Sequence, residues 1–188
     1  DRVWVIDPLD GTVNFVHGID HTAVSVALWV QGVPRVGVIV DVNRSLTYRA
    51  AAGEGAWLGS VRLGVTDRPA EESVIASGYP YDRREKADVY GDFTARMLET
   101  CRGIRRFGAA ALDMAWVARG TVDGYMEPGL PAGVQPWDVA AGILLVREAG
   151  GEVINIRGEP AGLEETMFIA GGPRTISGLL ASLEGWRS

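Results

Sequence analysis

Two aspartates separated by two residues follow an apolar run near the start of the chain, in the segment WVIDPLDGTVNF at 4–15. Pro8 fixes its own φ angle and lacks an N–H group, so it bends the chain directly after Asp7. On such a bend Asp7 and Asp10 can point into one pocket, where their repulsion would raise a pKa unless a cation neutralises it. Mg²⁺ binds carboxylates together with phosphate oxygens and water. The spacing favours a Mg²⁺ site, although Asp-Gly alone is also typical of a hairpin turn.

The next two residues, Gly11 and Thr12, extend this hypothesis toward phosphate chemistry. If a helical turn begins there, its N–H groups and dipole form an anion site beside the metal. Glycine also allows an anion to approach the backbone closely. Thr12 then either caps the turn or orients a water molecule.

A third acid, Asp138, lies in the segment PWDVAAGILLVREAGG at 136–151. It precedes a nearly all-apolar run, where the ordinary role of an aspartate is to cap a helix. A residue that caps a rigid helix can also bind a metal. Spacing along the chain does not bring Asp138 to Asp7 and Asp10, so its role as a ligand is a hypothesis.

The elements that must position these residues alternate along the chain. Apolar, β-rich runs predict strands, the later of them in an antiparallel meander, at 3–6, 22–30, 36–42, 46–50 and 55–58. Periodicity and stop signals predict helices at 86–100, 109–119, 139–149 and 175–183. Further strands are predicted at 105–107, 124–127, 152–156 and 166–170. We therefore expect a layered α/β fold with a mixed sheet.

Composition limits the class of protein. The 188 residues, 47% of them hydrophobic, suit one domain or two small joined lobes. No apolar run is long enough for a transmembrane helix and no leader precedes the first strand, so we expect a cytoplasmic protein without a membrane partner. The net charge of −6 argues against nucleic-acid binding, although the pairs Arg83–Arg84 and Arg105–Arg106 could meet a phosphate locally. The single cysteine, Cys101, is expected to pack rather than to react.

Four segments together resemble the inositol monophosphatase family of Mg²⁺-dependent, lithium-sensitive sugar-phosphate phosphatases. WVIDPLDGTVNFVHG at 4–18 and PWDVAAGILLVREAGG at 136–151 resemble its two hallmark motifs. SGYPYDRR at 77–84 and RRFGAAALDMAWVARGTVDGYME at 105–127 are similar to family stretches in the same order. The resemblance implies the sugar-phosphatase fold, a layered αβαβα sandwich with mixed sheets. It further implies one unit over 1–188 with two packed lobes, about 1–100 and 101–188, and commonly a homodimer.

The resemblance also implies a metal site of two or three Mg²⁺ ions. Asp7 would bridge two ions, the carbonyl of Leu9 would contact one of them, and Asp10 and Asp138 would bind the second. Asp7 and Asp10 would thereby be catalytic residues, together with Thr12, whose hydroxyl would orient the attacking water.

Substrate contacts follow from the same resemblance. Gly11 and Thr12 would hold the phosphate through backbone N–H groups, and Asp138 would also lie against the substrate. Glu127 matches the acid that meets substrate hydroxyls in inositol-type members, although a lone acid on a strand is by itself an ordinary solvated residue. His17 and His21 are expected to be structural rather than catalytic bases.

The implied activity is direct hydrolysis of inositol monophosphate, or of a related sugar or polyol phosphate, by metal-activated water. Histidinol phosphate, fructose 1,6-bisphosphate and 3′-phosphoadenosine 5′-phosphate are rival substrates within this class. The alternative from another class is a catalytically incomplete module that binds phosphate or metal and supports assembly.

Three departures from the family pattern bear on these expectations. The chain begins just before the first motif strand, so the N-terminal helices and a glutamate that supplies a metal ligand are expected in a longer product, rather than a substitute such as Asp41 or Glu54. Without these covering helices, we expect an exposed apolar patch on the first strand. Ala109 stands where the family usually has a hydroxyl residue. A Gly/Pro-rich insertion between Glu127 and Asp138 should alter the pocket rim.

Overall fold

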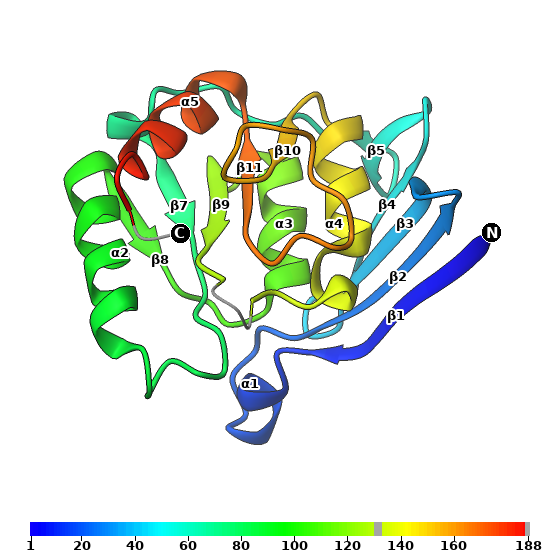
Figure 1. Cartoon of the computed structure of the whole chain (residues 1–188). Coiled ribbons are helices and arrows are strands. Elements are labelled where there is room, and N and C mark those ends of the chain that lie inside the picture. The colour runs from blue at the N-terminus through cyan, green and yellow to red at the C-terminus, as the bar shows by residue number, and fades with distance from the viewer. Residues whose placement is uncertain (130–132, 187–188) are drawn as a thin grey trace.

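The computed structural model describes residues 1–129 and 133–186, and two β-sheets in it alternate with layers of helices (Figure 1). Sheet A is antiparallel, with strands in the order β1 (Arg2–Asp10), β2 (Ala23–Val30), β3 (Val33–Asp41), β4 (Leu46–Ala51), β5 (Gly55–Leu58) and β6 (Val61–Arg62). Sheet B is mixed, in the order β10 (Glu152–Ile154), β11 (Phe168–Gly171), β9 (Gly124–Glu127), β7 (Val74–Ala76) and β8 (Gly103–Arg105). In sheet B, β7 pairs in parallel with β8 and β9, and the other pairs are antiparallel.

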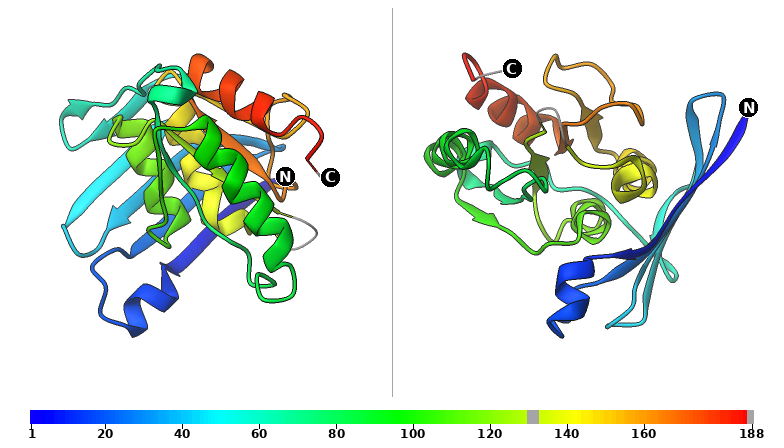
Figure 2. Two further views of the ribbon diagram at one scale, coloured as in Figure 1. Left: turned by 90° about the vertical axis from the view of Figure 1, so that its left-hand side faces the viewer. Right: turned by 60° about the horizontal axis from the view of Figure 1, so that its bottom comes forward.

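The four longer helices lie between the sheets and on the far side of sheet B (Figure 2). α3 (Ala110–Arg119) and α4 (Pro136–Glu148) form the inner layer, whereas α2 (Ala87–Thr100) and α5 (Pro173–Ser182) form the outer one. α1 (Thr12–Val16) directly follows β1, and a short 3₁₀ helix, η1 (Ala70–Glu72), precedes β7. The predicted layered α/β fold is thereby confirmed, and the division into lobes near residue 100 stays a prediction.

α4 is apolar on all sides because it contacts both sheets and α3. Two glycines permit this close packing. A Cβ on Gly37 of β3 would lie 2.9 Å from the carbonyl oxygen of Ala141, and one on Gly142 would lie 2.5 Å from the Cβ of Met114. α4 is therefore fixed between sheet A and α3, which matters because its first turn carries Asp138.

Several predicted elements have shifted bounds. β1 continues to Asp10 through a register shift between Asp7 and Asp10 against β2. α4 begins at Pro136, earlier than expected, because proline is tolerated at the first helical position, where no N–H partner is needed. β8 ends at Arg105 instead of continuing to residue 107, since its partner β7 ends at Ala76, the residue that pairs with Arg105.

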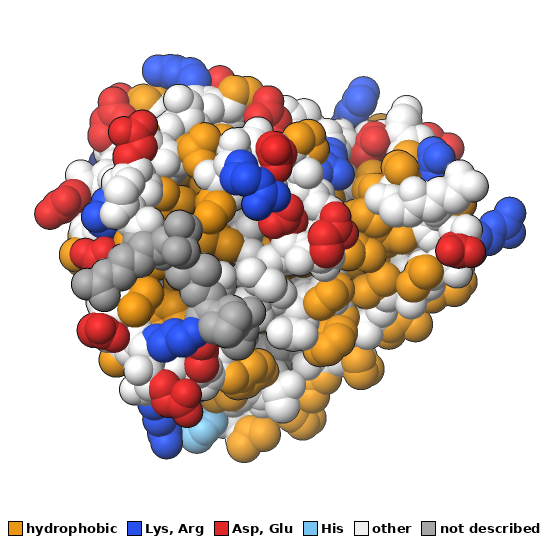
Figure 3. Space-filling model, in the orientation of Figure 1, with side chains coloured by type: hydrophobic (Ala, Val, Ile, Leu, Met, Phe, Trp, Pro, Cys, Tyr) orange, Lys and Arg blue, Asp and Glu red, His pale blue; other side chains and the backbone are white. Residues whose placement is uncertain are grey.

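The outer face of sheet A, which points away from α3 and α4, is apolar along β1 to β3 and open to solvent. On this face Trp4 is 61% exposed, whereas Trp29 on the inner face is 3% exposed. Figure 3 shows hydrophobic side chains along the lower right border, where β1 and β2 lie. The predicted exposed apolar patch on the first strand is thus confirmed. Among the described residues, none of the helices has the length and apolar character needed to cross a membrane.

The two tryptophans give a matched test of these faces. We expect Trp4→Ala to lower the fluorescence of a dye that binds apolar surface, while changing the free energy of unfolding by less than about 1 kcal/mol. Trp29→Ala should cost about 3–5 kcal/mol because it removes a buried ring. It also removes the 3.3 Å bond from Nε1 to the carbonyl of Ala140. Urea unfolding measures both costs, and equal losses would contradict this assignment of the faces.

Candidate functional site

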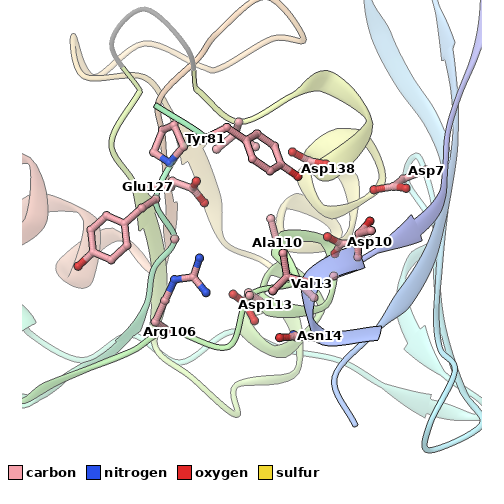
Figure 4. A pocket seen from close by; sticks show the side chains of 18 of the residues that line it. Asp7, Asp10, Val13, Asn14, Tyr81, Arg106, Ala110, Asp113, Glu127 and Asp138 are labelled. Carbon is pink, nitrogen blue, oxygen red and sulfur yellow. The ribbon is translucent and has the colours of Figure 1, made fainter. Parts of the chain in front are cut away.

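A cavity of about 380 Å³ opens where the end of β1, the end of β9 and the first turns of α3 and α4 come together (Figure 4). Five acids and two arginines of the described residues line it: Asp7, Asp10, Asp113, Glu127, Asp138, Arg83 and Arg106. The wall therefore carries an excess of negative charge. A phosphate entering such a cavity would be repelled unless cations offset the carboxylates.

Three of these acids meet on one side of the cavity. One carboxylate oxygen each of Asp7, Asp10 and Asp138 lies within 4.8 Å of the others. A cluster of oxygen ligands is what a hard divalent cation binds. The structure thus brings Asp138 to the two acids of the first motif, which the sequence spacing did not determine.

Asp10 is attached to the first turn of α3. Its Oδ2 accepts a hydrogen bond of 2.8 Å from the N–H of Ala111. The N-cap of α3 is Ala109, which has no side-chain oxygen, so Asp10 satisfies this helix end from another element. Burial raises the pKa of Asp10 well above its usual range, and the charge of Asp138 raises it further, whereas the hydrogen bond from Ala111 lowers it. A bound cation would favour its ionised form.

Asp7 and Asp138 each accept one backbone N–H group as well. Oδ1 of Asp7 accepts from the N–H of Leu9 at 2.9 Å. Asp138 is the third residue of α4 and not its N-cap, as the sequence had suggested, because the helix begins at Pro136. Its Oδ2 accepts from the N–H of Gln135 at 3.0 Å in a capping box. Burial raises the pKa of Asp138 to about 6, and Asp7 contributes in the same direction.

Gly11 and Thr12 form the turn from β1 into α1. Gly11 is the N-cap, with φ +82°, and Thr12 is the first helical residue rather than the cap. The Thr12 hydroxyl donates to the carbonyl of Leu9 at 3.1 Å. The first N–H groups of a helix have no acceptor within it. Because Leu9, Gly11 and Thr12 all line the cavity, this turn places polar groups beside the acid cluster.

Glu127 ends β9 and lies on the other side of the cavity from Asp7 and Asp10 (Figure 4). It is 9% exposed, so it is not the solvated strand acid that its position alone suggested. Its Oε2 accepts a 2.6 Å hydrogen bond from the hydroxyl of Tyr125. Burial raises the pKa of Glu127 to about 7, although the bond from Tyr125 lowers it.

Asn14 and Asp113 also line the cavity, and the sequence alone gave no role to either. Nε2 of His21 lies 3.0 Å from Oδ1 of Asp113, and both residues are buried. Nδ2 of Asn14 donates to the carbonyls of His21 and Phe107, at 2.9 and 2.8 Å. Burial raises the pKa of Asp113 to about 6, and His21 opposes this shift. These side chains stood inside the recognised motifs, but no spacing rule pairs residues so far apart.

Other residues singled out from the sequence lie away from the acids. Cys101 packs against the core between sheet B and α2, and burial raises the pKa of its thiol to about 11. Asp41 pairs with Arg44 and does not line the cavity, and Glu54 is exposed in the loop before β5. Part of the Gly/Pro-rich insertion, residues 130–132, lies outside the described residues, whereas Val134 lines the cavity.

The turn at Gly11 leads to a stability prediction with an internal control. A Cβ at Gly11 would lie 2.8 Å from the carbonyl oxygen of His21, while a Cβ at Gly18 would meet nothing within 4 Å. Both glycines have positive φ, at +82° and +67°. We expect Gly18→Ala to cost about 1 kcal/mol and Gly11→Ala about 3 kcal/mol, since only the second adds a clash to the backbone strain. Urea unfolding at one pH compares them, and equal costs would contradict the crowding.

Glu127 leads to a pH prediction for the metal-free protein. Its folded pKa, about 7, lies above its ordinary value of 4.5, so the folded state holds a proton that the unfolded chain releases. This stabilisation is complete below about pH 4.5 and is lost as the pH rises through about 7. The loss from Glu127 is on the order of 3 kcal/mol. Unfolding curves from about pH 5 to 8 with a chelator should therefore be flatter for Glu127→Gln, and parallel curves would refute this.

Comparisons with known proteins agree over nearly the whole sequence. Residues 1–185 match the profile of the Inositol monophosphatase family. Nus factor SuhB of Escherichia coli (strain K12) is 42% identical over 184 residues, which are 97% of this chain and 67% of that relative. The chain therefore spans about two thirds of the length of this relative.

Two solved structures show the same fold. Inositol monophosphatase from Anabaena (Nostoc) sp. PCC 7120 superposes with a TM-score of 0.90 at 39% identity, covering 99% of this chain and 76% of that one. The inositol monophosphate-bound SaIMPase-II gives a TM-score of 0.86 at 32% identity, covering 98% of this chain and 70% of that one. With the sequence profile and the fold in agreement, the chain belongs to the inositol monophosphatase family.

Proposed function

We propose that this chain hydrolyses phosphomonoesters of inositol, or of a related polyol or sugar, with Mg²⁺ as its cofactor. Membership of the family supports a phosphatase. The observation that carries the proposal is the convergence of Asp7, Asp10 and Asp138 within 4.8 Å in a cavity with an excess of acids. Without cations this wall would repel the phosphate that the family processes.

The donor set fits Mg²⁺. Carboxylate oxygens of Asp7, Asp10 and Asp138 would hold it, with the carbonyl oxygen of Leu9 as a further ligand, and such hard oxygen donors are what Mg²⁺ binds. The raised pKa values of Asp10 and Asp138 are expected where like charges are buried together without a cation. When bound, Mg²⁺ supplies charge for the phosphoryl oxygens and Lewis acidity for the attacking water. Two or three ions are proposed, as for the family.

The residues of the chain would position phosphate and water. Gly11 lines the cavity, and the N–H groups at the start of α1 would bind the phosphate oxygens. The Thr12 hydroxyl donates to the carbonyl of Leu9, so its own oxygen remains an acceptor that can orient a water proton. The described cavity wall contains no serine, cysteine or histidine, and Asp7, Asp10 and Asp138 are assigned to the metal, so we propose direct attack by water and no covalent intermediate. The products would be inorganic phosphate and the free polyol.

The choice of substrate would depend on the side of the cavity that faces Asp7 and Asp10, where Glu127 lies. The cavity volume of about 380 Å³ suits a phosphate with a small polyol. Glu127, which faces this space, would accept hydrogen bonds from polyol hydroxyls. The related SaIMPase-II was crystallised with inositol monophosphate, which supports inositol phosphate as the first substrate to test. Cytoplasmic location, a homodimer, lithium sensitivity and the absence of nucleic-acid and membrane partners stay predictions.

The test is phosphate release from inositol 1-phosphate and the rival phosphomonoesters, with Mg²⁺ or with a chelator. We expect turnover to require Mg²⁺, and Asp138→Asn to lower kcat/KM at least about a hundredfold, because charge stabilisation by a metal is worth several kcal/mol. Asp92→Asn is the matched control. Asp92 lies on α2 outside the cavity and pairs with Arg96, so its rate should stay within about twofold.

Other outcomes separate the alternatives. Mg²⁺-dependent turnover that survives in Asp138→Asn would overturn the proposed site. A folded chain that binds Mg²⁺ and phosphate in calorimetry without turnover would support the alternative of a binding module. The name of the Escherichia coli relative, a Nus factor, is a reason to test this alternative. Failure to bind Mg²⁺, with or without phosphate, would reject both.

A further inference from the structure

Glu127 has a buried partner that the proposed reaction does not use. Tyr125, two residues earlier in β9, is 0% exposed, and its hydroxyl donates to Oε2 of Glu127 at 2.6 Å. Residues i and i+2 of a strand share one face of the sheet, so the backbone of β9 sets both side chains. β9 pairs with β11 along its whole length and with β7 at Gly124 and Tyr125, which fixes the backbone of Tyr125 from both sides and that of Glu127 from one.

A second contact limits the position of the same carboxylate. Gly78 lines the cavity beside Glu127, and a Cβ at this position would overlap the Glu127 carboxylate. Any other residue at 78 would therefore displace the Glu127 side chain or be displaced by it. Glu127 is thus held between the Tyr125 hydroxyl and the bare backbone of Gly78, and it can lie there because no side chain fills the space.

The direction of the hydrogen bond has a chemical consequence. A phenol can donate to a carboxylate only while it keeps its own proton, and burial together with the charge of Glu127 raises the pKa of Tyr125 well above its usual range. Tyr125 therefore remains a donor throughout the neutral range, and its bond favours the ionised, acceptor form of Glu127. The other charged groups around Glu127 are Asp138 and Asp113, which oppose ionisation, and Arg106, which favours it.

We propose that Tyr125 is a positioning residue that holds Glu127 as a hydrogen-bond acceptor facing the cavity, and so selects phosphomonoesters with a free hydroxyl near the phosphate. This inference rests on the proposed function. A buried acceptor left without a partner is costly, so a site of this kind discriminates strongly against an analogue that lacks the hydroxyl. Alkyl and aryl phosphates without hydroxyls would gain nothing from Tyr125.

Tyr125→Phe removes only the hydroxyl and keeps the buried ring. We expect the KM for inositol 1-phosphate to rise about tenfold while kcat changes less than about threefold, and kcat/KM for phenyl phosphate to remain unchanged. The pH above which KM reaches its low plateau should rise by about one unit, because Glu127 loses a bond that favours its ionisation. A merely structural role would affect both substrates equally and would not move this pH.

Tyr90→Phe is the matched control. The hydroxyl of Tyr90, on α2, donates to Asp82 at the same distance of 2.6 Å, and Tyr90 does not line the cavity. Its removal should change neither the ratio of the two substrates nor the pH profile. Equal increases in KM for both substrates in Tyr125→Phe, or the same change in Tyr90→Phe, would overturn the inference.

A readout without turnover separates this inference from the proposed function. Carbon NMR of the carboxyl-labelled protein should show the titration of Glu127, identified by its loss in Glu127→Gln, shifted upward by about one unit in Tyr125→Phe. No shift would overturn the inference even in an active enzyme. If Tyr125→Phe fails to fold, Glu127→Gln alone should raise the KM for inositol 1-phosphate and spare phenyl phosphate. If it folds, adding Tyr125→Phe to Glu127→Gln should have no further effect on selectivity.

Discussion

Three carboxylates held within 4.8 Å of one another in a largely buried place repel each other, and the surrounding structure must offset that repulsion. Each acid accepts one backbone N–H group, donated to Asp7, Asp10 and Asp138 by Leu9, Ala111 and Gln135. The donors to Asp10 and Asp138 lie at the start of α3 and of α4, where the helix dipole also favours negative charge. The pKa values of Asp10 and Asp138 remain raised nonetheless, chiefly by burial and further by the neighbouring acids, so the backbone groups offset the cost of ionising them only in part.

The same repulsion would push the acids apart if the elements that carry them could move. α4 cannot retreat, because it is enclosed by sheet A, α3 and sheet B. At its other end, the carboxylate of Glu148 accepts 2.8 Å hydrogen bonds from the N–H groups of Gly53, in the loop after β4, and of Gly55, the first residue of β5. Asp138 is therefore held at a fixed place relative to β1. Packing far from the cavity in this way maintains an arrangement of charges that is unfavourable in itself.

The cavity lies between the two sheets, and each sheet supplies a different kind of group. Sheet A brings Asp7 and Asp10 at the end of β1, and sheet B brings Glu127 at the end of β9. α3 lies between them, and its buried Asp113 pairs with His21, which follows α1. In the proposed function, the packing of the sheets against α3 and α4 then sets the distance between the phosphate end and the hydroxyl end of the substrate.

The sequence by itself determined the local parts of this protein: the turn at Gly11, the apolar helix that carries Asp138 and the alternation of strands and helices. These follow from propensities and periodicities within a few residues, and two whole motifs gave the family. It also indicated the apolar outer face of β1.

Only the tertiary structure decided which distant residues meet. It showed that Asp138 lies beside Asp7 and that His21 pairs with Asp113. It also showed that Asp10 of β1 accepts a hydrogen bond from the first turn of α3, whose N-cap, Ala109, has no side-chain acceptor. Such contacts depend on how sheets and helices pack together, and no pattern within a short stretch of chain encodes that packing.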